Sequence, residues 1–169
     1  MKIKSEFIVS FSAIFVSVST LFVCIYQARI MQKQQHTSVL PYVEWLYNNA
    51  GNEFWISVEN KGIGPAFVKG VTMKLDGEEV ESNSALFKKL LGPVRFNFSN
   101  STVDGRVISP GEKIEMVHVY DTVQGRAIDS LLLWDNSPHK FSLEICYCSV
   151  YGDCWTTDGN NSTESQCEK

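Results

Sequence analysis

Residues 54–75 read FWISVENKGIGPAFVKGVTMKL, and this stretch is the clearest indication of architecture in the chain. Apolar residues alternate with polar ones on both sides of a glycine-rich centre. The alternating apolar residues are Phe54, Ile56 and Val58 before the centre, and Val71, Met73 and Leu75 after it. A period of two is typical of half-buried antiparallel strands. The stretch therefore predicts strands over 53–60 and 66–75, joined by a short connection.

The connection, with the sequence N-K-G-I-G-P-A over residues 60–66, is the most distinctive local motif. Gly62 and Gly64 permit a positive φ, and Pro65 stiffens the exit. Asn60 can hydrogen-bond the backbone of its own loop. A phosphate-binding loop is the alternative, but it needs successive free amides that lead into a helix. Because Pro65 has no N–H and a predicted strand follows, we interpret Asn60, Gly62, Gly64 and Pro65 as a structural crossover motif.

Similar alternation recurs along the rest of the chain, with turn signals such as Asp76-Gly77 between the segments. Seven short strands with regular turns predict an antiparallel β-sandwich. One helix is predicted over 82–91, with Ser82 or Ser84 as its cap, and a weaker one over 127–134. The predicted strands are 41–47, 53–60, 66–75, 94–98, 112–119, 140–149 and 153–157.

The amino-terminal segment has a different character, because residues 7–28 contain no charge. As a helix these residues would span about 33 Å, enough to cross the hydrocarbon core of a bilayer. The serines in it are tolerable, because their hydroxyls can bond carbonyls one turn earlier. A cleaved signal sequence is the alternative, but residues 23–26 offer no small-x-small cleavage site. The sequence predicts an uncleaved membrane anchor that includes Phe7, Phe11, Phe15, Leu21 and Tyr26.

Length and charge distribution complete the domain organisation. The chain has 169 residues, of which 44% are hydrophobic and 20% charged, and a net charge of −4. These values exclude collagen, coiled-coil and disordered classes, and the acidity gives no basic face for nucleic acid. The predicted organisation is a tail over 1–6, a transmembrane helix over 7–28, a helical stalk over 29–38, a β-sandwich domain over 39–158 and a polar carboxy-terminal tail over 159–169.

The order of these features resembles that of a group of uncharacterised bacterial single-pass membrane proteins. The resemblance is carried by the apolar helix with its Gln-rich stalk, the motif at 60–66, and the later segments 108–112 and 145–153. It covers most of the chain. It implies an immunoglobulin-like β-sandwich on a single anchor, and it implies no activity.

Four cysteines lie beyond the anchor, within the last 24 residues: Cys146, Cys148, Cys154 and Cys167. The turn at 151–153 would fold Cys154 back toward Cys148, which favours a Cys148–Cys154 bridge. A Cys146–Cys167 bridge would then hold the polar tail. Four cysteines allow three pairings, and zinc bound by thiolates or free reduced thiols remain alternatives.

Disulfides imply an oxidising compartment. The charges that flank the anchor do not set its orientation, because two basic residues lie on each side of it. The cysteines therefore favour an inner-membrane protein of bacteria with its carboxy-terminal domain in the periplasm.

The sequence contains no recognisable catalytic, cofactor or metal motif around its three histidines, and Glu78-Glu79 reads as solvated charge beside a turn. We therefore expect a non-enzymatic interaction or accessory module that binds the lipid bilayer and another protein. Trp55 on the outer sheet face could bind that partner, or the stalk or the 82–91 helix could cover it. The alternatives are a membrane-bound sensor or small-ligand receptor and a component of a bacterial defence system.

Overall fold

The computed structural model describes residues 5–48, 53–93, 97–120, 122–132, 139–159 and 161–167. The chain forms two compact units that divide after Ser38, where the sequence places the end of the stalk. We describe each unit separately.

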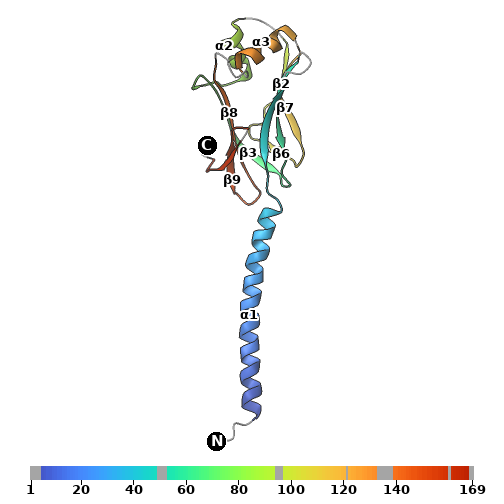
Figure 1. Ribbon diagram of the computed structural model, residues 1–169, viewed down its shortest axis with the longest axis vertical. Coiled ribbons are helices and arrows are strands. Elements are labelled where there is room, and N and C mark those ends of the chain that lie inside the picture. Colours follow the sequence, from blue (N-terminus) through green and yellow to red (C-terminus); the bar gives the residue numbers. More distant parts are fainter. Residues whose placement is uncertain are drawn as a thin grey trace. The chain divides into compact units, whose positions relative to one another are not determined.

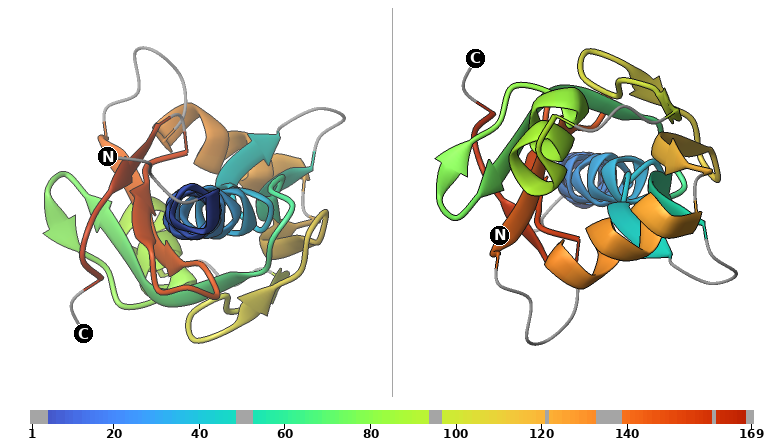
Figure 2. Two further views of the ribbon diagram at one scale, coloured as in Figure 1. Left: turned by 90° about the horizontal axis from the view of Figure 1, so that it is seen from below. Right: turned by 90° about the horizontal axis from the view of Figure 1, so that it is seen from above.

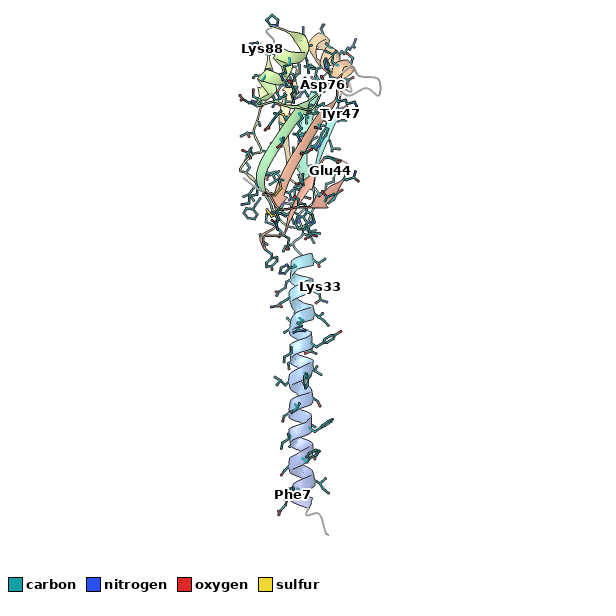
Figure 3. All side chains as sticks on the ribbon, turned by 90° about the vertical axis from the view of Figure 1, so that its left-hand side faces the viewer. Phe7, Lys33, Glu44, Tyr47, Asp76 and Lys88 are labelled. Carbon is teal, nitrogen blue, oxygen red and sulfur yellow. A yellow bond between two sulfur atoms is a disulfide. The ribbon has the colours of Figure 1, made fainter. Side chains whose placement is uncertain are left out.

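The first unit is the helix α1 (Ser5–Thr37), which includes both the apolar segment and the polar stalk. It is long and apolar enough to cross a membrane, and its side chains project on all sides (Figure 3). The hydroxyls of Ser10, Ser17, Ser19 and Thr20 each lie 2.8 Å from the carbonyl oxygen four residues earlier. The expected return bonds are therefore present, and they satisfy these groups inside the helix.

The second unit is built from two antiparallel sheets, which appear as separate layers in Figure 1 and Figure 2. The first sheet has the order β1 (Val43–Asn48), β2 (Phe54–Asn60), β7 (Lys113–Val119), β5 (Phe98–Asn100). The second has the order β10 (Ser162–Glu164), β9 (Cys154–Thr157), β8 (Phe141–Cys148), β3 (Ala66–Leu75), β4 (Glu78–Glu79), and β6 (Val107–Ile108) pairs with β3.

The core lies between the two sheets. From β2 it takes Phe54, Ile56 and Val58, and from β8 it takes Leu143, Ile145 and Tyr147, all of them buried. These are the alternating apolar positions of each strand, so the predicted strands bury the faces that their period of two indicates. The prediction of a mainly β sandwich behind a long apolar helix is confirmed.

Two short helices contact each other at one end of the sheets: α2 (Asn83–Leu91) and α3 (Thr122–Leu132). The Oγ of Ser82 accepts a hydrogen bond from the N–H of Ala85 at 3.2 Å, so Ser82 caps α2 as the sequence suggests. The helix predicted over 127–134 starts five residues earlier than expected. The added residues include Gly125, whose low helix propensity hides the earlier start in the sequence but which is buried within α3. Residues 133–134 of the prediction lie outside the described residues.

The strand assignments differ from the predictions in two respects. The strand predicted over 94–98 is β5 at Phe98–Asn100, and residues 94–96 lie outside the described residues. The short strands β4, β6 and β10 were not predicted, and β10 lies in the supposed carboxy-terminal tail. An edge strand needs only backbone pairing on one side, so β10 has no apolar alternation by which to recognise it.

Candidate functional site

The side chain of Asn60, at the end of β2, is fully buried and makes every hydrogen bond that an amide can make. Its Oδ1 accepts from the N–H groups of Tyr42 at 3.2 Å and Gly62 at 3.0 Å. Its Nδ2 donates to the carbonyl oxygens of Gly64 at 2.8 Å and Ile108 at 3.0 Å. One side chain therefore joins β6, the motif loop and the residues that follow α1 in the chain.

Backbone contacts extend this junction. The N–H of Lys61 donates to the carbonyl oxygen of Tyr42 at 2.8 Å, and that of Ile63 donates to Leu40 at 3.1 Å. A Cβ on Gly62 would lie 2.3 Å from the nitrogen of Tyr42, and one on Gly64 would lie 1.8 Å from the oxygen of Val39. Neither glycine has a positive φ, contrary to the expectation from the sequence. Both are required because the two backbone segments lie so close together.

The four domain cysteines form two disulfides, Cys146–Cys167 and Cys148–Cys154. This is the pairing that the sequence favours. Cys148 and Cys154 are partners in the β8–β9 ladder, while Cys167 attaches the segment after β10 to β8. The sulfurs of Cys148, Cys154 and Cys167 lie within 4.8 Å of one another. In this bonded form they are not thiolates, so neither the zinc nor the free-thiol alternative describes the structure.

The residues predicted to anchor the chain lie exposed along α1. Phe7, Phe11, Phe15, Leu21 and Tyr26 are each at least 60% exposed. Exposed aromatic and aliphatic groups at this density are costly in water and favourable in hydrocarbon. Cys24, also on α1, is the free cysteine of the described chain.

Two histidines of the domain pair with carboxylates in contacts that the sequence does not reveal. The ring nitrogens of His118 lie 3.2 Å from a carboxylate oxygen of Glu53 and 3.1 Å from one of Glu115. The two contacts hold the ring between Glu53 and Glu115. Glu53 is 65 residues from His118, and no local spacing could have brought the two together.

The second pair is at the β3–β4 turn. Nδ1 of His139 lies 2.7 Å from Oδ2 of Asp76, whose Oδ1 accepts the N–H of Lys140 at 2.8 Å. The bond from Lys140 and the bond to His139 hold the pKa of Asp76 below its usual value. Figure 3 shows Asp76 at the same end of the domain as Lys88 of α2. The arrangement fixes the turn between β3 and β4.

Trp55 is half-buried on β2, and the ammonium of Lys113 lies 4.0 Å from the centre of its ring. This is a cation–π contact. The sequence left open whether Trp55 is exposed or covered by the stalk or by 82–91. In the structure the ammonium of Lys113, on the neighbouring strand β7, lies over the ring.

No model of a known protein family matches the chain, and no curated protein matches its sequence. The functional argument therefore rests on the chain's own residues.

Proposed function

We propose that this protein is a single-pass membrane protein that displays a non-enzymatic β-sandwich as an interaction module. The observation that carries the proposal is the exposed apolar surface of α1, followed within five residues by chain that is bonded into the domain. A helix of this kind needs lipid around it, and the domain begins as soon as it ends.

The disulfides support one side of the membrane for the domain. Cys146–Cys167 and Cys148–Cys154 bridge the carboxy-terminal strands, and such bridges persist in oxidising compartments. We propose an amino terminus inside the cell and a domain in the bacterial periplasm. An immunoglobulin-like module in this location would contact another protein, and its acidic charge disfavours nucleic acid.

The contacts of the domain's cysteines and of His118 and His139 support the non-enzymatic part of the proposal. The cysteines are bonded to each other, His118 is held between carboxylates, and His139 is bonded to Asp76. Each group is committed to the fold, which is the pattern of a structural module.

A labelling experiment on intact cells tests both the anchor and its orientation. We expect a membrane-impermeant maleimide to label the domain cysteines only after treatment with an impermeant reductant. Because Cys24 is free, the Cys24→Ser variant is the matched control, and its labelling should be unchanged. Labelling that requires lysis would reverse the orientation. Release of the protein from membranes by alkaline carbonate would contradict the anchor.

A further inference from the structure

A cleft of about 330 Å³ opens between the free edges of the two sheets. On one side it is bounded by β3 and β4, and on the other by β5 and the residues after it, with the start of α2 closing the end. The opposite edge of the sandwich is closed, because the ring of Trp45 packs edge-on against Phe141 and lies beside Gly159. Clefts of about 300–1,000 Å³ are typical of small-ligand sites. We call this space the edge cleft.

The floor of the edge cleft is aliphatic. It is lined by Met73, Val80, Val103 and Met116, and the last three are buried, with at most 5% of their surface exposed. Unbranched, flexible methionine side chains adapt to extended hydrocarbon chains. The floor therefore suits an aliphatic segment of a ligand.

The rim of the edge cleft is acidic. Glu79, Glu81 and Asp104 line it, and no lysine or arginine does. Among the described residues, no cation lies within 4.0 Å of these three carboxylates; the neighbouring Lys89 pairs with Glu78, and Lys74 pairs with Glu144. A concave surface with one sign of charge concentrates the opposite sign. The rim therefore favours a cationic group.

A buried amide adds an acceptor to this site. Asn83, the first residue of α2, lines the edge cleft and is 6% exposed. Its Nδ2 donates to Oδ1 of Asn100 at 2.7 Å and to the carbonyl oxygen of Met116 at 3.4 Å. The Met116 carbonyl oxygen can only accept a hydrogen bond. The group of Asn83 that faces it must therefore be the NH2 group and not the amide oxygen. Within the described residues the Oδ1 of Asn83 has no donor, and it is free to accept one from a ligand.

We propose that the edge cleft binds a primary ammonium group carried on an aliphatic chain. The chain would lie on Met73 and Met116, and the ammonium would pair with the rim carboxylates and donate to Oδ1 of Asn83. This chemistry has two sources, a free aliphatic diamine and a lysine side chain of a partner. A site of this kind would make the protein a receptor as well as a displayed module, and it does not depend on the orientation in the membrane.

The test is calorimetric titration of the purified full-length protein in nanodiscs. We expect 1,5-diaminopentane to bind and glutarate, which has the same chain length and the opposite charge, not to bind. The double variant Glu79→Gln/Glu81→Gln should weaken diamine binding at least tenfold. The Glu78→Gln variant is the matched control, because Glu78 is on the same strand but does not line the edge cleft, and it should bind as the wild type does.

A second arm distinguishes the sources. A short lysine-containing peptide with blocked ends that binds more tightly than the diamine assigns the site to a protein partner, and the reverse assigns it to a small molecule. The proposal is overturned if neither amine binds, if glutarate binds equally well, or if Glu79→Gln/Glu81→Gln leaves the affinity unchanged. None of these results bears on the anchor or on its orientation, which the labelling experiment tests separately.

Discussion

Asn60 and Asn83 are both buried asparagines at the end of a regular element, and the structure uses them differently. Asn60 closes β2 and makes four side-chain hydrogen bonds, two through each end of its amide. Asn83 opens α2 and makes two, both through Nδ2. The first is enclosed by backbone on all sides, and the second faces the edge cleft. Burial alone therefore does not separate a structural amide from a candidate binding group, whereas the count of used donors and acceptors does.

The difference follows from where each residue stands in the fold. Asn60 lies where the motif loop, β6 and residues 39–42 converge, so backbone N–H and carbonyl groups surround it. Asn83 lies beside β4 and β5, each of which is the last strand of its sheet in the described part of the chain. Polar groups at such an edge keep hydrogen-bond donors and acceptors without a protein partner, and water or a ligand can pair with them.

The largest expected effect separates these two asparagines. Asn60→Ala removes four side-chain hydrogen bonds at a fully buried position, two of them buried themselves, so we expect a loss of unfolding free energy of about 3 kcal/mol or more. Asn83→Ala removes two bonds, but the Met116 carbonyl still accepts the N–H of Ser101 at 3.0 Å and Asn100 is exposed, so we expect a loss of about 1 kcal/mol. Urea denaturation of the full-length protein in detergent, followed by tryptophan fluorescence, measures both.

Asn60→Asp sharpens this test. It keeps the acceptor for Tyr42 and Gly62 but sets a carboxylate oxygen against the carbonyls of Gly64 and Ile108. We expect it to be nearly as destabilising as the alanine variant. Equal stabilities of the Asn60 and Asn83 variants would contradict the comparison.

A smaller effect is expected from the glycines around Asn60. Gly64→Ala would push a methyl group into the carbonyl of Val39, and overpacking against backbone costs about 2 kcal/mol. Gly70 on β3 is the matched control, because a Cβ there meets no atom within 4 Å. We expect Gly70→Ala to be neutral or to stabilise the domain by up to about 1 kcal/mol, since glycine weakens a strand. The same denaturation assay checks both, and a neutral Gly64→Ala would show that residues 39–42 do not need this close approach.

The sequence predicts well what depends on neighbours in the chain. The strand at 66–75 and the Ser82 cap follow from a period of two and from a local hydroxyl, and both are found. The disulfide between Cys148 and Cys154 follows from one turn. These features need no knowledge of distant segments.

Features that depend on distant segments could not be predicted in the same way. The role of Gly64 depends on Val39, which approaches it only in the folded domain. The edge cleft combines Glu79, Asn83 and Asp104 from three separate segments, and Glu79 alone reads as solvated charge beside a turn. How many of its hydrogen bonds an amide makes depends on the packed structure. The sequence therefore identifies Asn60 as part of a structural motif but does not identify Asn83 as a candidate binding group.

Asp76 extends the comparison to an exposed polar group, because each of its carboxylate oxygens has a hydrogen-bond partner. We expect its substitution to have the smallest effect on stability. Its pKa is lowered by the N–H of Lys140 and by His139, so its contribution to stability is present above the unfolded pKa, near 3.8. This contribution is lost as the pH falls through the lower pKa of the folded state. Asp76→Asn keeps the size and the tolerance for the positive φ of 56° at this turn, and it removes the charge.

We therefore expect Asp76→Asn to melt at a lower temperature than the wild type at pH 6, and the difference to shrink steadily as the pH is lowered from 5 toward 2. Thermal denaturation at a series of pH values measures this convergence. His139→Ala, which removes one of the two partners and leaves the Lys140 bond, should show a smaller pH-dependent difference than Asp76→Asn below pH 5. A difference between Asp76→Asn and the wild type that stays constant across this range would mean that the carboxylate charge adds nothing to the turn, and that hydrogen bonds made equally well by an amide hold Asp76 in place.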